Sequence, residues 1–269
     1  MRSPPLIPLL AAALLVMGAT FPEANYDAPM DMAGVDLGPS RTASEQNNAV
    51  RCHTYRGMMV KEVDLREVGD EQISLIPVGP RAFPPCQRAA LPGERIVSPE
   101  VWRGYFAGMF SRFAVLRAAD GSNGGIEFAV WPVTLQAPVY VSTASGPLRF
   151  DFGAAGRVVL RFDRLYLADC SVPAGGAACA QAIARETAAQ AVAVDLCLLG
   201  YEAARRMQAR RYCEAEDDAS DACFQKAMRN LPALTKVPSV IAIPTDVTLQ
   251  GLSSREQVVA APRACWPQD

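Results

Sequence analysis

The sequence contains very little histidine, which excludes several kinds of catalytic centre. His53 is the only histidine among 269 residues, so a zinc site built from three histidines or from an HExxH motif is excluded. A Ser-His-Asp or Cys-His hydrolase would have to use His53 as its base, and no G-x-S-x-G element is present to pair with it. A single histidine beside a cysteine and a tyrosine at the start of a strand is usually structural, and we interpret His53 in that way.

Excess positive charge is also absent. Lys and Arg number 26 against 28 Asp and Glu, which gives a formal net charge of −2 at pH 7. The chain therefore has no general positive field to attract a phosphate backbone or an anionic bilayer. We do not expect nucleic acid to be a partner.

Long apolar runs are confined to the N-terminus. Residues 1–20 carry Arg2, an apolar stretch over 6–17 and then small residues, which is the pattern of a secretory signal peptide, with cleavage between Gly18 and Ala24. A membrane-spanning helix needs about 20 apolar residues, and this stretch is shorter. The sequence therefore predicts a periplasmic or secreted protein with no transmembrane segment after removal of the signal.

Close cysteine pairs are missing as well. Zinc ligands are usually spaced as C-x₂₋₄-C, whereas the nearest cysteines here are nine and ten residues apart. An even number of cysteines in an exported chain indicates disulfides, and we predict neither a metal nor another cofactor. The loop-like segment CSVPAGGAAC predicts a bridge between its two ends, and the other pairings stay open. The 8 cysteines expected in disulfides are Cys52, Cys86, Cys170, Cys179, Cys197, Cys213, Cys223 and Cys265.

The sequence has ample material for a folded core, since 50% of its residues are hydrophobic. Residues 21–49 lack periodicity and are rich in Pro, Gly, Ser and Asn, so we predict a flexible leader there and a single β-rich domain over 50–269. Short β-branched and aromatic runs separated by turn residues indicate strands. They are expected near 52–64, 72–78, 104–109, 112–117, 126–131, 138–142, 147–151 and 157–168.

An alanine-rich segment with helical periodicity then predicts a helical insertion over 177–231. Gly200 is the expected break within it. Period-two alternation returns over 238–251, where Pro244 argues for an edge strand. The predicted fold class is α+β and β-rich, with a mainly antiparallel sheet or sandwich, a helical insertion and disulfides.

The segment DGSNGG, residues 120–125, separates two alternating apolar runs. Asn-Gly favours a tight hairpin because both central residues of the turn need a positive φ. A calcium loop of the EF-hand kind starting at Asp120 would need oxygen donors at its third and fifth positions, which are Ser122 and Gly124. We therefore predict a hairpin here rather than a calcium site.

Acidic pairs could serve a hydrolase of the glycosidase kind, which needs two carboxylates about 5 to 9.5 Å apart. Glu62 and Asp64 are expected on one face of a strand. Further acids lie near expected strand ends, namely Asp151, Asp163 and Asp169. Nearby arginines and lysines make ordinary ion pairs the simpler interpretation, and the sequence selects no catalytic pair.

The segment WRGYFAGMFSRF, residues 102–113, groups five aromatic residues. Trp102, Tyr105 and Phe106 are the candidates for a ligand-binding wall. The same aromatics would also suit the core of a β-rich domain.

Three groups of motifs, WRGYFAGMF…DGSNGG…FAVW, ADCS…C and PSVIAI…CWP, resemble a family of uncharacterised secreted proteins from Gram-negative bacteria. The resemblance covers most of residues 52–267 and implies export to the periplasm, but it brings no activity, cofactor or catalytic residue. The absence of the usual catalytic motifs favours a non-catalytic binding or structural module of the cell envelope, with an envelope protein or a small ligand as partner. The alternative is a periplasmic hydrolase that uses a carboxylate pair.

Overall fold

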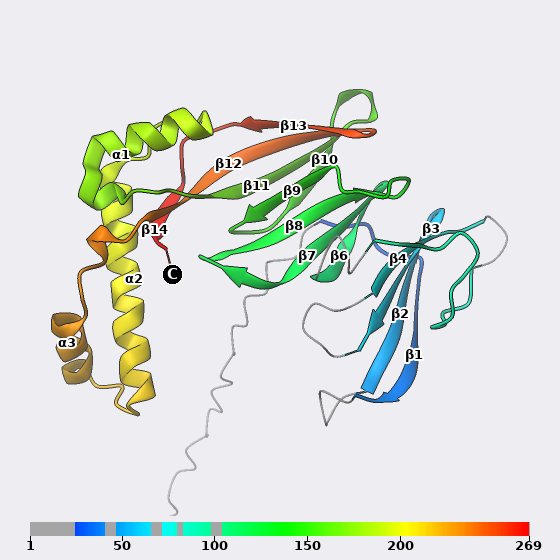
Figure 1. Ribbon diagram of the computed structural model, residues 1–269, viewed down its shortest axis with the longest axis horizontal. Helices are drawn as coiled ribbons and strands as arrows, with labels where there is room; N and C mark the ends of the chain where they lie inside the picture. The colour runs from blue at the N-terminus through cyan, green and yellow to red at the C-terminus, as the bar shows by residue number, and fades with distance from the viewer. Residues whose placement is uncertain (1–24, 41–46, 66–71, 80–82, 98–103, 269) are drawn as a thin grey trace, which may run out of the picture.

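The computed structural model describes residues 25–40, 47–65, 72–79, 83–97 and 104–268 (Figure 1). The predicted signal peptide over 1–20 and Trp102 lie outside the described residues.

A smaller antiparallel sheet holds the N-terminal part of the described chain, at the right of Figure 1. Its strands are paired in sequence order, β1-β2-β3-β4-β5. They are β1 (Asp31–Pro39), β2 (Asn47–Tyr55), β3 (Met58–Asp64), β4 (Gln72–Pro77) and β5 (Arg95–Ile96). The central strand β3 is buried along its whole length, which explains why its apolar residues do not alternate strictly with polar ones.

A larger antiparallel sheet is paired in the order β13-β12-β11-β9-β8-β7-β6, and β10 and β14 pair with β11 and β12. Its first strands are β6 (Gly104–Phe110), β7 (Phe113–Ser122), β8 (Gly125–Pro132), β9 (Tyr140–Ala144), β10 (Arg149–Phe152) and β11 (Val158–Leu167). The C-terminal part adds β12 (Ser239–Gln250), β13 (Ser253–Val258) and β14 (Ala264–Pro267). With 44% of the described residues in strands and 24% in helices, the predicted β-rich α+β class is confirmed.

The two sheets share an apolar core. Burial of these side chains away from water stabilises the contact between the sheets. The smaller sheet contributes Tyr55, Met58, Val60, Ile73 and Leu75, and the larger sheet contributes Met109, Ala114, Leu116, Ala129 and Trp131. Because this core lies on β6, β7 and β8, it holds that end of the larger sheet against β2, β3 and β4.

Three helices of the described chain follow β11 and lie at the opposite end of the larger sheet, at the left of Figure 1. They are α1 (Val172–Thr187), α2 (Val194–Ala215) and α3 (Asp221–Asn230). Short 3₁₀ turns, Ala154–Gly156 and Leu234–Lys236, complete the described elements. The predicted helical insertion over 177–231 is therefore present, although its first helix begins five residues earlier than predicted.

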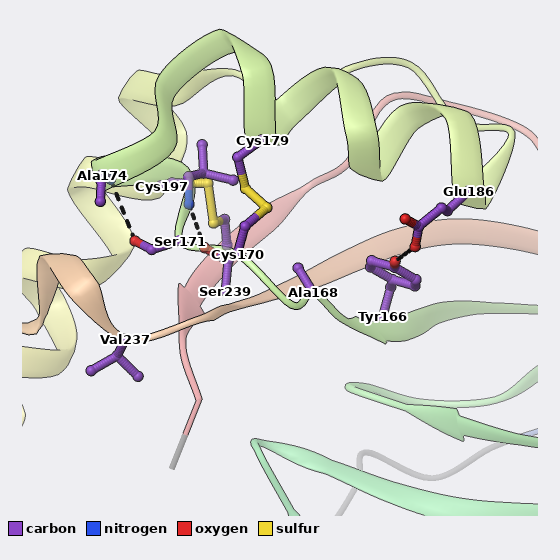
Figure 2. Close-up of a disulfide and its surroundings, with 12 residues drawn as sticks. Tyr166, Ala168, Cys170, Ser171, Ala174, Cys179, Glu186, Cys197, Val237 and Ser239 are labelled. Carbon is purple, nitrogen blue, oxygen red and sulfur yellow. Dashed lines mark hydrogen bonds between the residues drawn. A yellow bond between two sulfur atoms is a disulfide. The ribbon is translucent and has the colours of Figure 1, made fainter.

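The start of α1 combines a cap with a disulfide (Figure 2). The Ser171 hydroxyl accepts a hydrogen bond from the Ala174 N–H, which satisfies one of the amide groups left without a partner at a helix N-terminus. Cys170, just before the cap, forms a disulfide with Cys179, which lies nine residues later within α1. The predicted Cys170–Cys179 bridge is confirmed.

All eight cysteines are paired in the described chain. Besides Cys170–Cys179, the bridges are Cys52–Cys86, Cys197–Cys265 and Cys213–Cys223. They tie the loop after β4 to β2, the start of α2 to β14, and the end of α2 to α3. Each bridge therefore anchors a segment at the edge of a sheet or at the end of a helix.

Gly200 does not break a helix, and that prediction is wrong. It lies inside α2, which begins only at Val194, while the preceding helix ends at Thr187 and is followed by Ala188 in the left-handed conformation (φ 54°). Gly200 is required for a different reason: a Cβ there would lie 2.9 Å from the carbonyl carbon of Cys265, and closer still to its oxygen. The glycine lets α2 contact the backbone of β14 directly.

The predicted hairpin at DGSNGG is confirmed. β7 and β8 pair up to Ser122 and Gly125, so Asn123 and Gly124 form the two-residue turn. Both have positive φ, 52° and 78°, as the Asn-Gly signal requires. A second hairpin was not predicted: the expected single strand over 52–64 is interrupted at Gly57 (φ 84°) and forms β2 and β3.

Part of the predicted flexible leader over 21–49 is ordered as a strand, which corrects that prediction. β1 pairs with β2 from Asp31 to Pro39. Most of its residues are exposed because it lies at the edge of the smaller sheet. An exposed edge strand needs no apolar alternation, so the sequence pattern gave no sign of it.

Pro244 lies in an inner strand, so the edge prediction is also wrong. β12 pairs with β11 on one side and with β13 and β14 on the other. Pairing with β14 covers 239–242 and pairing with β13 begins at Thr245, so Pro244 falls between the two partners. Its carbonyl accepts from the Val259 N–H, and the missing N–H faces the same side, where neither strand needs it.

Candidate functional site

A cleft of about 450 Å³ lies between the two sheets. Its walls come from β1, β2 and β3 on one side, from β6 and β7 on the other, and from the segment that precedes β1. The lining residues are Tyr26, Asp27, Pro29, Met32, Arg51, His53, Tyr55, Glu62, Tyr105, Phe106, Ala107, Gly108 and Arg117. The cleft has the size of a small-molecule site and mixes aromatic with charged side chains.

Two of the three residues predicted as a ligand wall line this cleft. Tyr105 and Phe106 are neighbours on β6, and both are partly exposed. The Phe106 ring lies 5.5 Å from the imidazole of His53 and 6.4 Å from the ring of Tyr55, measured between centroids. Phe106 thus contacts β2 of the smaller sheet, whereas Tyr105, opposite Arg117 in the register, lies on the other face of the edge strand β6.

The strand register places His53 beside an acid. On β2 and β3, His53 is opposite Val60 and Arg51 is opposite Glu62, so His53 and Glu62 are diagonal neighbours on one face. The Nε2 atom of His53 lies 3.1 Å from Oε1 of Glu62. The Glu62 side chain is only 6% exposed, and the imidazole supplies the polar partner that a buried carboxylate needs.

An ion pair between Arg51 and Asp64 extends the same face. The Arg51 guanidinium donates to Oδ2 of Asp64 at 2.7 Å. The Asp64 side chain is 5% exposed, whereas that of Arg51 is 43% exposed and reaches the cleft. The predicted acids Glu62 and Asp64 therefore do lie on one face, and each is held by a basic side chain.

The segment before β1 closes the end of the cleft and connects the two sheets. Asn25 exchanges two hydrogen bonds with the backbone of Phe150. The Tyr26 ring lies directly over Gly108, where an added Cβ would meet the Cβ of Tyr26 at 2.9 Å. Asp27 accepts from the Ser111 N–H at 2.5 Å. Gly108 is therefore needed so that the ring can lie against the backbone of β6.

Burial and nearby acids keep the phenols of the cleft protonated. Burial, together with the negative charges of Asp27 and Glu62, raises the pKa of Tyr55 to about 12. Burial also raises the pKa of Tyr26, and the positive charge of Arg117 opposes that shift only in part. Both hydroxyl groups can therefore donate hydrogen bonds at neutral pH.

The other predicted acids do not join this cleft. Asp151 is paired with Arg161, and Asp163 lies 3.4 Å from Arg263, in both cases on the larger sheet. Asp169 follows the end of β11. Among the residues that the structure describes, no group of three or more His, Cys, Asp or Glu side chains is placed to hold a metal ion.

Sequence reasoning considered His53, Glu62 and the aromatic run separately and did not bring them together. Period-two alternation places residues 51 and 53 on one face of their strand, and residues 62 and 64 on one face of theirs. Only the pairing register of the two strands shows that these residues share the same face of the sheet. Nothing in the sequence indicated that Tyr26 and Asp27 line a cleft, because their segment was expected to be a flexible leader.

The chain is thus a disulfide-linked protein of two antiparallel sheets with a polar and aromatic cleft between them. Comparison with protein families, with curated proteins and with solved structures found no match. Of the helices in the described part of the chain, none combines the length and the apolar character that crossing a bilayer requires.

Proposed function

We propose that the protein is a non-catalytic binding module of the bacterial cell envelope, which holds a small ligand in the cleft between its two sheets. The observation that carries this proposal is the meeting of Tyr105 and Phe106 with the His53–Glu62 pair around a volume of about 450 Å³. Small-molecule sites commonly have this size and combine aromatic walls with a few fixed polar groups.

The envelope location is part of the proposal. Four disulfides are typical of proteins that fold in an oxidising compartment, such as the periplasm or the extracellular space. The signal-peptide pattern over 1–20 supports the same location.

A binding role is favoured over a hydrolase because the two acids that line the cleft already have fixed partners. Glu62 contacts His53, and Asp27 accepts from the Ser111 N–H. Asp64 is paired with Arg51 and does not line the cleft. A glycosidase-type mechanism needs two carboxylates facing one bond, with one of them able to give up a proton.

A ligand-observed NMR screen tests the proposal on the disulfide-bonded protein. The library contains neutral sugars, amino acids, nucleosides, amines and carboxylic acids. We expect at least one class to bind the wild type, to bind Tyr105→Ala clearly more weakly, and to bind Tyr212→Ala normally. Tyr212 is a matched control because it is 48% exposed on α2, outside the cleft.

Two results would contradict this function. The first is that no class binds, or that Tyr105→Ala and Arg51→Met both bind as the wild type does. The second is turnover of a chromogenic glycoside or ester that disappears in Glu62→Gln, which would identify a hydrolase instead.

A further inference from the structure

Several charged groups that line the cleft already have polar partners within the protein. Arg51 pairs with Asp64 at 2.7 Å, and His53 contacts Glu62 at 3.1 Å. A charged ligand that displaced Arg51 or His53 would leave a buried carboxylate without its polar partner, which is costly. The cleft therefore offers little net attraction to either an anion or a cation.

Asp27 and Arg117, which also line the cleft, have contacts of other kinds within the protein. The Asp27 carboxylate accepts a hydrogen bond from the Ser111 backbone N–H. The Arg117 guanidinium lies 5.9 Å from the centre of the Tyr105 ring, in a cation–π arrangement. The lining contains two acids, Asp27 and Glu62, and two arginines, Arg51 and Arg117, so no one sign of charge dominates it.

Groups that already have one partner still have hydrogen-bonding capacity. A guanidinium carries five N–H donors and a carboxylate accepts at about four lone-pair sites, so one ion pair does not exhaust either of them. The Arg51 side chain is 43% exposed at the cleft, and the protonated hydroxyl of Tyr55 adds a group that can both donate and accept. A neutral ligand with several hydroxyl groups can use such a mixed set without breaking the pairs.

The aromatic wall supplies the apolar half of the same recognition. Tyr105 and Phe106 are partly exposed at the cleft, and Phe106 is held in place by its contacts with His53 and Tyr55. The face of an aromatic ring is electron-rich and attracts weakly positive C–H groups. A sugar ring presents such C–H groups on its faces and hydroxyl groups around its edge.

We infer that the cleft binds a neutral saccharide at the edge of β6, with its sugar rings in contact with Tyr105 on one face of the strand and Phe106 on the other, and its hydroxyl groups hydrogen-bonded to Arg51, Glu62 and Tyr55. This inference rests on the proposed function, because it names the class of ligand for the same cleft.

Isothermal titration calorimetry on the disulfide-bonded protein tests the inference with defined probes. The neutral probes are maltotriose, cellotriose and triacetylchitotriose, and the charged probes are spermidine, inorganic phosphate and a heparin tetrasaccharide. We expect a neutral probe to bind with the same affinity at low and high NaCl, because no counter-ions are displaced. Tyr105→Ala should weaken that binding by about tenfold or more, and Tyr212→Ala should leave it unchanged.

Arg51→Met tests the polar half of the contact. It keeps most of the length of the side chain but removes the hydrogen-bond donors, and we expect it to weaken the binding of a neutral probe as well. Arg211→Met, on the exposed side of α2, is the matched control.

Failure of the inference can be told apart from failure of the proposed function. If a charged probe binds in a salt-sensitive way and Tyr105→Ala weakens that binding, the inference of a neutral saccharide is overturned. The proposal of a binding module is then still supported. The same holds if the NMR screen finds a ligand for the cleft but none of the three neutral probes binds. If neither experiment finds a ligand for the cleft, both proposals are overturned.

Discussion

Replacing Gly200 by alanine sets two physical effects against each other. In the interior of a helix, Gly→Ala normally stabilises by about 1 kcal/mol, because glycine has the higher backbone entropy to lose. At Gly200, however, the new methyl group would lie 2.9 Å from the carbonyl carbon of Cys265. Carbon atoms in contact are normally about 3.5 to 4.0 Å apart, so α2 or β14 must move.

The Cys197–Cys265 disulfide restricts that movement, since it joins the same two elements one helical turn away. Overpacking of this kind typically costs about 1 to 3 kcal/mol, and more where the surroundings cannot shift. Because the contact here is with backbone, we expect Gly200→Ala to lower the free energy of unfolding by about 2 kcal/mol. For a domain of this size that corresponds to a decrease of about 4 to 8 °C in Tm.

Urea unfolding followed by circular dichroism, with the disulfides intact, measures this change. Ala203→Gly is the matched control: Ala203 is exposed on α2, and its replacement should cost about 1 kcal/mol through helix propensity alone. A Gly200→Ala protein that is more stable than the wild type would refute the direct contact between α2 and β14.

Three further predictions concern stability. Lys61 is fully buried and its ammonium lies 2.7 Å from the Glu94 carboxylate. Lys61→Met should therefore lower the free energy of urea unfolding by about 3 to 5 kcal/mol, whereas Lys226→Met, at an exposed lysine, should change it very little. Equal effects of the two substitutions would refute the buried ion pair. Burial alone would raise the pKa of Glu94, but hydrogen bonds from Lys61, Leu91 and Ser74 lower it overall. The stability that Glu94 contributes is therefore present above its unfolded pKa of about 4.3 and is lost as the pH falls through the lower folded pKa. Glu94→Gln should reduce the loss of unfolding free energy at acidic pH. A pH profile of stability identical to that of the wild type would contradict the lowered pKa of Glu94. Replacing Cys197 and Cys265 together by serine removes a disulfide between residues 68 positions apart and should lower the free energy of unfolding by about 4 kcal/mol. An unchanged Tm would contradict this prediction.

Local signals in the sequence predicted those parts of the fold that depend on few residues. The Asn123–Gly124 turn requires only two positive φ angles, and the Cys170–Cys179 bridge joins residues only nine apart, although the segment between them is the start of α1 and not the expected loop. The helical insertion likewise follows from alanine content and periodicity over 177–231.

Features set by distant partners were missed. β1 is a strand because β2 offers it an edge, not because its own residues favour one. Gly200 looked like a helix break, although its role is to let the backbone of Cys265 approach. Pro244 suggested an edge because the sequence does not reveal where one partner strand ends and the next begins.

The candidate site was predictable only in pieces. The aromatic run singled out Tyr105 and Phe106, and alternation placed Glu62 and Asp64 on one face. Their meeting with His53 depends on packing between two sheets, which no periodicity within a single segment can indicate.

The measurement that tests the central claim most directly is a backbone amide NMR titration of the disulfide-bonded protein with a ligand found in the screen. If the cleft between the sheets is the binding site, amides of β2 and of β6 should shift together and saturate at the same ligand concentration. Shifts confined to one sheet, or gathered on α2 and α3, would contradict a site shared by the two sheets.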